Sequence, residues 1–282
     1  MIPNIYPLEN VHIRKLAEIA PVEVPVYATE SLQVNARECR LVIAGAGVYY
    51  ALEGRQLWYA SEPGADTQWA TGQLEGLPLA ALLHQRGVLH FHAASFVFEG
   101  EGVLLLGQSG AGKSSLTAAF AMAGATALSD DLSAIVFEGS QPVIWPVDRQ
   151  IRLRQNTIGQ LQLGPGQLEA QDPITGKYTF KTRPHQIDRF ELHHLIHLET
   201  YPGTNTCLEP PPAQEQFSLL RSEVCHWEIL RGMPKTEKDY LGKILQILNH
   251  TQLIRVQRSE NCSITCLQKT IANFMRKQKQ KA

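Results

Sequence analysis

The 282-residue sequence predicts an α/β fold, and three observations predict it. A glycine-rich segment, "GQSGAGKSS" (107–115), stands between the apolar run "GVLLL" and the helix-type run "LTAAFAMAG". Short β-type runs separated by turn residues fill the region from Val22 to Glu62, which is typical of an antiparallel sheet. Strand-type and helix-type runs then alternate along the rest of the chain. We therefore expect an α/β core preceded by a β-rich layer.

The elements just before the glycine-rich segment follow from composition and turn residues. Residues 72–87 are rich in Leu and Ala and end at a glycine, so they predict a helix, with Pro78 in its first turn. The runs "VLHFHAASFVFEG" and "GVLLLG" predict two strands joined at Glu99–Gly102.

The elements after the segment are read in the same way. A helix ends at Gly124, and "ATALSDD" predicts a short strand that ends in two carboxylates. Further β-type runs, a short helix within 151–167, a polar loop over 170–188 and the strand "ELHHLIHLE" follow. The prolines of "EPPPAQEQ" predict a break before the helical runs "FSLLRSEVCHWEIL" and "KDYLGKILQILN" and the late strand "QLIRVQ".

Three regions result from this division. Residues 1–85 form a β-hairpin-rich region that ends in a helix, residues 86–205 form the core, and residues 206–282 form a C-terminal region of helices and strand that packs on the core.

Composition limits the partners and the compartment. The formal net charge is −1, which gives no basic field for a nucleic acid, and the basic tail "RKQKQKA" (276–282) is interpreted as a frayed, solvated end. No apolar run of 18 residues and no secretory signal pattern is found, so we expect a cytoplasmic protein without a membrane partner. Five loosely spaced cysteines indicate reduced thiols.

The glycine-rich segment has the spacing G-x-x-x-x-G-K-[ST], which defines a P-loop when a strand precedes it and a helix follows. Such a loop cradles the phosphates of a nucleoside triphosphate, ATP or GTP, at a helix N-terminus. Its lysine reaches the β- and γ-phosphates, and its last hydroxyl binds Mg²⁺. The residues predicted to hold the nucleotide are Gly107, Ser109, Gly110, Ala111, Gly112, Lys113, Ser114 and Ser115.

Two carboxylates follow the P-loop helix at a strand end. In this position one carboxylate of the pair Asp130–Asp131 can hold Mg²⁺ directly or through water. The other can accept the proton of an attacking hydroxyl. Lys113 is the third catalytic candidate, because its charge offsets charge in the transition state.

His92 lies in "LHFHAAS", on the predicted strand before the P-loop strand. A histidine there can hold a carboxylate in place or carry protons, so His92 is a catalytic candidate and His90 its competitor. Phosphoryl transfer also needs positive charge at the equatorial oxygens. The basic residues that follow the loop and are open to this role are Arg152, Arg154, Lys177, Lys181 and Arg183.

Three histidines, His193, His194 and His197, have a spacing that resembles a metal site. Alternation along a strand puts the first and the last on one face and the middle one on the other. A plain strand is therefore the favoured interpretation.

The segment from Leu89 to Ile135 resembles the catalytic domain of HPr kinase/phosphorylase. The family has a histidine on the strand before the loop, then "GxSGxGKS", a helix and "G…DD", which fall here on His92, the P-loop, Gly124 and the pair Asp130–Asp131. The resemblance implies a P-loop kinase core of the HPr kinase and phosphoenolpyruvate carboxykinase type, with an N-terminal β-rich layer in place of the family's own domain. It also implies transfer of phosphate to a serine hydroxyl, with His92 and Asp130 near that hydroxyl and Ser114 and Asp131 around Mg²⁺, or with the two aspartates exchanged.

The sequence lacks the family signature "EIRGxGI", and "RQIRLRQ" is only a loose substitute, so HPr itself is not the expected substrate. The pattern is more similar to the related lasso-peptide serine kinases, which implies a peptide or protein substrate bearing a serine, such as the C-terminal serine of a lasso-peptide precursor. A small-molecule P-loop kinase and a nucleotide-gated binding module without transfer are the alternatives. The choice of nucleotide, the number of phosphates added, any reverse phosphorylase activity and the oligomeric state stay open.

Overall fold

The computed structural model describes residues 8–147, 150–172, 175–182 and 189–280, and the fold is mixed α/β as predicted. The chain forms two compact units. One contains the residues up to His90 together with Val224–Leu245, and the other contains Phe91–Glu223 and the residues from Gln246 onward. The units therefore do not follow the boundaries 1–85, 86–205 and 206–282 of the sequence-based division, because a piece of the C-terminal region belongs with the first unit.

The first unit contains a six-stranded sheet in the order β1-β6-β5-β4-β3-β2. Adjacent strands from β2 to β6 pair antiparallel, as predicted, whereas β1 joins β6 in parallel. The strands are β1 (His12–Lys15), β2 (Tyr27–Ala28), β3 (Leu32–Val34), β4 (Glu38–Ile43), β5 (Gly47–Leu52) and β6 (Gln56–Ser61).

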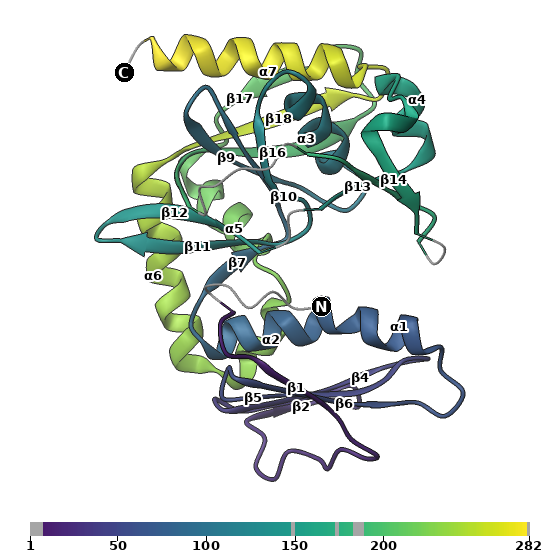
Figure 1. Ribbon diagram of the computed structural model, residues 1–282. Coiled ribbons are helices and arrows are strands. Elements are labelled where there is room, and N and C mark those ends of the chain that lie inside the picture. The colour runs from purple at the N-terminus through teal and green to yellow at the C-terminus, as the bar shows by residue number, and fades with distance from the viewer. Residues whose placement is uncertain (1–7, 148–149, 173–174, 183–188, 281–282) are drawn as a thin grey trace. The chain divides into compact units, whose positions relative to one another are not determined.

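Helical residues cover one face of this sheet (Figure 1). The single helix predicted over 72–87 is wrong in its bounds: the helices are α1 (Thr67–Gly72), the 3-10 helix η1 (Gln73–Glu75) and α2 (Leu77–Gln85). The interruption falls at Gly76, which has φ −98° and ψ −121° and so leaves the helical region. Pro78 lies in the first turn of α2, as predicted.

The segment 224–245 contributes the 3-10 helix η3 (Trp227–Gly232) and most of α6 (Pro234–His250). Its contacts explain why it belongs to the first unit. The Tyr240 hydroxyl donates to the Val88 carbonyl at 2.6 Å, and the Arg231 guanidinium donates to the Tyr27 hydroxyl at 2.8 Å.

Two buried histidines lie in the first unit. The His90 Nδ1 donates to the Val88 carbonyl at 2.8 Å, the His84 Nε2 donates to the Cys225 carbonyl at 2.9 Å, and the two ring centroids are 4.4 Å apart. Burial lowers the pKa of His90 to about 4, although its bond to Val88 acts in the opposite direction. Burial and the nearby His90 hold the pKa of His84 well below its usual value. Both rings are therefore neutral in the folded state near neutral pH.

These pKa values predict a loss of stability in mild acid. The unfolded chain protonates its histidines near pH 6.5, whereas folded His90 stays neutral down to about pH 4. The unfolded state therefore binds more protons in this window, and the free energy of unfolding falls with falling pH, by about 1.4 kcal/mol per pH unit for each such histidine. Thermal unfolding from pH 7 to pH 4 measures this slope. H90N keeps a donor to Val88 and should flatten it, while H12N, at an exposed position, should not; an equal slope in all three proteins would contradict the assignment.

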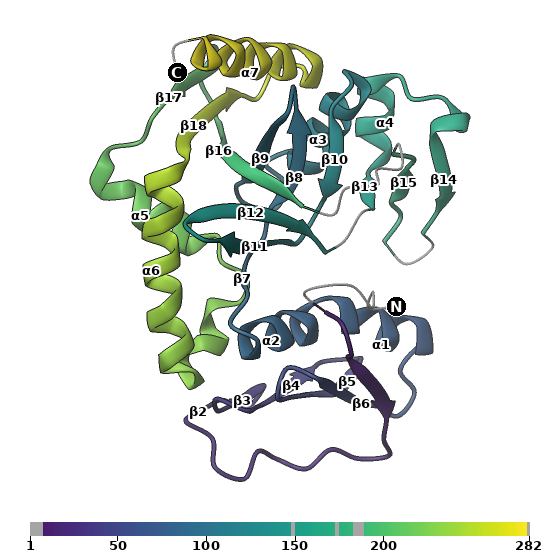
Figure 2. The same ribbon diagram turned by 60° about the vertical axis from the view of Figure 1, so that its left-hand side comes forward.

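The second unit is built on a nine-stranded sheet, in which β10-β8-β9-β16-β12-β11-β7 are adjacent and β18 joins β16 and β17. Of β7, only Phe91 belongs to this unit. β9 and β18 both pair with β16 in parallel, so all three strands end at the same edge of the sheet (Figure 2). The strands are β7 (Leu89–Phe91), β8 (Ala94–Phe98), β9 (Glu101–Leu106), β10 (Thr126–Ser129), β11 (Ser133–Glu138), β12 (Gln141–Pro146), β16 (Phe190–Tyr201), β17 (Cys207–Glu209) and β18 (Gln252–Ser259).

Two sequence-based predictions for this unit need correction. The predicted strand "VLHFHAASFVFEG" is divided into β7 and β8, and His92 lies in the bend between them rather than on a strand. The predicted polar loop over 170–188 contains β15 (Tyr178–Phe180) and part of β14 (Leu168–Gln171), which form a small sheet with β13 (Ile151–Leu153). The buried Phe180 packs with Ile151 and Leu153 of β13, which explains why Tyr178–Phe180 forms a strand. The short helices beside it are α4 (Gln155–Leu161), as predicted, and η2 (Pro165–Gln167).

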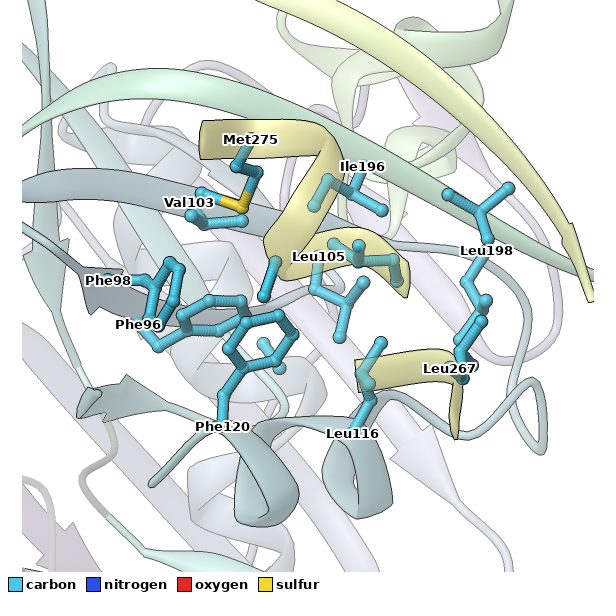
Figure 3. Packing of buried hydrophobic residues seen from close by; sticks show 14 of the residues in the cluster. Phe96, Phe98, Val103, Leu105, Leu116, Phe120, Ile196, Leu198, Leu267 and Met275 are labelled. Atoms are coloured by element: carbon cyan, nitrogen blue, oxygen red, sulfur yellow. The ribbon is translucent and has the colours of Figure 1, made fainter. Parts of the chain in front are cut away.

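The core of the second unit lies between the sheet and helices α3 (Lys113–Met122) and α7 (Ile264–Lys279) (Figure 3). Phe120 stacks on Phe96 with centroids 4.5 Å apart, and Met275 packs into the same cluster. The tail beginning at Arg276 is not wholly a frayed end, because α7 continues to Lys279 and Arg276 forms an ion pair of 2.7 Å with Glu99. The remaining helix, α5 (Ala213–Ser222), begins inside the break predicted over 209–216, directly after its prolines. The single helical run predicted over 217–230 is interrupted after Ser222 and continues only as η3.

Among the described residues, no helix is both long enough and apolar enough to span a membrane. All five cysteines are free of disulfides.

Candidate functional site

The glycine-rich loop (107–112) connects β9 to α3, so the predicted strand and helix flank it. Gly107 has φ +130°, and a Cβ atom there would lie 2.3 Å from the Leu198 carbonyl oxygen of β16. Gly112 has φ +104° and is the N-cap of α3. Both positions therefore require glycine, the first for close approach as well as for its left-handed backbone.

The start of α3 is suited to an anion. Its N-cap residue is a glycine that offers no side-chain cap, so first-turn N–H groups are left for another acceptor. Lys113 is 6% exposed, and its Nζ donates to the Gly107 carbonyl at 2.5 Å and lies 3.5 Å from the Gln108 carbonyl. These two contacts hold the charge of Lys113 beside the backbone carbonyls at the start of the loop.

A cavity of about 240 Å³ opens at this loop. Of the predicted nucleotide-binding residues, Ser109, Gly110, Gly112, Lys113, Ser114 and Ser115 line it. The Ser115 hydroxyl is 2.8 Å from the Thr157 hydroxyl of α4, which also lines the cavity. Gly107 and Ala111 do not line this cavity, and both residues are buried within the loop.

Basic side chains dominate the polar wall of this cavity. Besides Lys113, the basic residues in the wall are Arg152, Arg154, Lys177 and Arg258. Asp131 is the one carboxylate among its described lining residues. Such an excess of positive charge favours a polyanionic ligand.

Arg258 was not identified from the sequence. The predicted late strand ends at Gln257, whereas β18 continues to Ser259 and carries Arg258 to the loop. Its guanidinium lies 3.7 Å from the position of a Cβ built on Gly112, and its Nε donates to the Thr200 hydroxyl at 3.2 Å. A basic residue at the end of a strand was the available signal, but its significance depends on the pairing of β18 with β16.

The two aspartates lie in the bend between β10 and β11 and face different surroundings. Asp131 is half-buried and lines the cavity. Asp130 is 1% exposed, and its Oδ2 accepts a hydrogen bond of 3.0 Å from the Arg152 backbone N–H. Asp130 therefore holds the strand that carries Arg152 into the wall.

The two histidine candidates, His92 and His90, differ in burial and in whether they line the cavity. His92 is exposed and lines the cavity with Asp131 and Lys113. His90 is fully buried in the first unit and takes no part in the cavity. Lys181 lies at a different surface hollow, beside Thr126 and Phe180, and Arg183 lies outside the described residues.

The three histidines of β16 do not converge. His194 Nε2 is 3.0 Å from Glu101, and His197 Nε2 is 3.0 Å from Glu223. Within the described part of the chain, no group of three or more His, Cys, Asp or Glu side chains could hold a metal ion. The prediction of a plain strand agrees with β16.

Glu223, the residue after α5, reaches the loop from a point 116 positions away in the sequence. Its Oε2 accepts from the Gly107 N–H at 3.2 Å, and its Oε1 bonds His197. Burial alone would raise the pKa of Glu223, but the bond and charge of His197, the Gly107 N–H and the charge of Lys113 together lower it. Glu223 is thus an anion close to Lys113, and no sequence pattern indicated it.

Comparisons with known proteins add one likeness. No family model and no curated protein matches the chain. The solved structures that match include the Hpr(Ser) kinase/phosphatase from Coxiella burnetii, with 13% sequence identity over 68% of this chain and 97% of that chain, at a TM-score of 0.35.

Proposed function

We propose that the protein is a phosphotransferase that moves the γ-phosphoryl group of ATP or GTP to a serine hydroxyl of a peptide substrate. One observation carries the proposal. A single cavity brings together the loop lysine Lys113, the hydroxyl of Ser114, the carboxylate of Asp131, the imidazole of His92 and further basic side chains from distant segments. Phosphate binding needs the first two groups, and transfer to a hydroxyl needs the others.

The basic side chains bind the triphosphate in this proposal. Lys113 contacts the terminal phosphates, and the first-turn N–H groups of α3 bind a phosphate oxygen. Arg152 and Arg258 stabilise the charge on the equatorial oxygens of the transferring group. Their planar guanidinium groups suit phosphate better than an ammonium does.

Mg²⁺ fits the donors that line the cavity. The Ser114 hydroxyl would hold the ion, and phosphate oxygens and water would complete its shell, as is usual for this cation. When bound, the ion supplies positive charge that offsets the charge of the phosphate oxygens. The carboxylate of Asp131, which lines the same cavity, is then left for the acceptor.

Asp131 orients the acceptor hydroxyl and accepts its proton as the new P–O bond forms and the nucleoside diphosphate departs. This gives Asp131 the role of general base that was predicted for Asp130. Burial supports the reassignment, because Asp130 is 1% exposed and already accepts the Arg152 N–H. His92 lies at the same cavity and orients Asp131 or the acceptor.

Intact mass spectrometry tests the proposal directly. The protein is incubated with ATP, Mg²⁺ and peptides that contain an internal or a C-terminal serine. We expect one or more serine peptides to gain the mass of phosphate, and peptides with alanine in place of serine to gain none. Consumption of ATP with no labelled peptide would contradict the peptide acceptor and favour a small-molecule acceptor or a nucleotide-gated binding module.

Arg258 supplies a more specific prediction. R258A should weaken nucleotide binding about tenfold or more, because a charge-assisted contact to phosphate is lost. R258K should recover part of the lost nucleotide affinity, since lysine restores the positive charge but not the planar guanidinium group. Titration with a fluorescent ATP analogue measures both. R276A, in the same unit but away from the cavity, is the control, and equal affinities for all these proteins would exclude Arg258 from the site.

A further inference from the structure

A second cavity, of about 620 Å³, lies against the same loop. It shares Gln108, Ser109 and Gly110 with the first cavity, so these loop residues take part in both walls. The opposite wall comes from the end of β16 and from the end of α5. This volume is in the range of sites that bind a small molecule or a few residues of a peptide.

The two cavities differ in charge. Glu199 and Glu223 line the second cavity with His197, Thr200 and Ser222, and no lysine or arginine is among its described lining residues. Arg255 lies 3.5 Å from Glu199 but also pairs with Glu215 at 2.8 Å, so its charge is divided between two carboxylates. The second cavity is therefore anionic, whereas the first is cationic.

His197 contacts both carboxylates in the wall of the second cavity, Glu199 and Glu223. His197 is 5% exposed and lies between them, with Nε2 3.0 Å from Glu223 and Nδ1 3.1 Å from Glu199. Only the first contact has the geometry of a hydrogen bond, and the buried Nδ1 has no hydrogen-bond partner among the described residues.

The carboxylate wall of the second cavity contacts the glycine-rich loop close to its lysine. Glu223 bonds the Gly107 N–H, and the charge of Lys113 is close enough to lower its pKa. Because Lys113 is the residue that reaches the β- and γ-phosphates, the carboxylate wall begins beside the terminal phosphate. The α- and β-phosphates and the nucleoside are left to the first cavity.

We propose that the second cavity binds the part of the acceptor next to its hydroxyl, while the hydroxyl itself reaches Asp131 in the first cavity past the loop residues that both cavities share. The second cavity then selects an acceptor with a positive charge close to that hydroxyl, as in a serine peptide with a neighbouring Lys or Arg. This inference rests on the phosphotransferase function proposed above. Glu199 binds the ammonium or guanidinium group, and Glu223 with His197 fixes the position of that wall against the loop. The same chemistry occurs in a small amino alcohol, so the test includes both sources.

Transfer rates with matched acceptors test the selection. The peptides are identical serine peptides with lysine, alanine or glutamate beside the serine, and the small acceptors are ethanolamine and the uncharged ethylene glycol. We expect the cationic member to be preferred about tenfold over its neutral counterpart in kcat/KM, mainly through KM. Labelling of the lysine peptide identifies a peptide source, and labelling of ethanolamine alone identifies a small-molecule source.

E199Q should remove this preference, whereas E138Q should keep it, because Glu138 is an exposed carboxylate of the same unit that does not line the cavity. T200R, which brings a positive charge to the wall, should disfavour the lysine peptide and checks the result if E199Q folds poorly. Equal labelling of lysine, alanine and glutamate peptides would overturn the acceptor assignment and leave the proposed transfer intact. No labelling of any acceptor while ATP still binds would overturn both.

Discussion

K113A should abolish detectable phosphoryl transfer and weaken nucleotide binding. The lysine ammonium lies at the mouth of the loop, with Nζ 2.5 Å from the Gly107 carbonyl, where the terminal phosphates are expected. Loss of one preorganised cationic donor lowers kcat by about 10²–10³-fold, and a lost charged hydrogen bond weakens binding about tenfold or more. Single-turnover transfer and nucleotide titration measure the two effects separately.

Two matched variants make this result specific. Lys243 is also partly buried and donates to a backbone carbonyl, Gly87, at 2.6 Å, but it lies in the first unit. K243A should therefore leave nucleotide binding unchanged. Thermal unfolding of K113A shows whether the loop still folds. Wild-type transfer by a folded K113A protein would exclude the loop as the phosphate site.

D131N should lower the transfer rate by about 10²–10⁴-fold, the range for loss of a general base, with little change in nucleotide affinity. An amide cannot accept the proton of the acceptor hydroxyl. D130N should cost less than about tenfold in rate, because an amide oxygen still accepts the Arg152 N–H that Asp130 now binds. Single-turnover rates of the two variants at saturating ATP make the comparison.

The reverse order would restore the roles first predicted from the sequence. If D130N lost transfer and D131N retained it, Asp130 would be the base, and its burial would have to change when substrate binds. D130A serves as the structural control, because it removes the acceptor for Arg152 as well and should weaken nucleotide binding more than D130N does.

Much of the site could be predicted because its determinants are local. The spacing of Gly107, Gly112 and Lys113 specifies a left-handed turn and an uncapped helix start within a few residues, and the structure has both. The aspartate pair follows the next strand, as its sequence indicated, and Asp131 and His92 line the same cavity as Lys113. The local sequence pattern did not show which of the two aspartates is buried. In the structure Asp130 is buried and Asp131 is half-buried.

Local sequence patterns are thus enough to predict the α/β class, the loop and the candidates beside it, because glycine conformation, helix starts and strand alternation depend on near neighbours. Which distant residues join them depends on how the strands pair. Parallel pairing aligns Leu106 of β9 with His197 of β16, and His197 with Arg255 of β18. The ends of these strands therefore meet at one edge of the sheet, where Arg258 reaches the cationic cavity and His197 and Glu199 reach the anionic one. Strand order and register depend on contacts between segments far apart in the chain, and no local spacing encodes them.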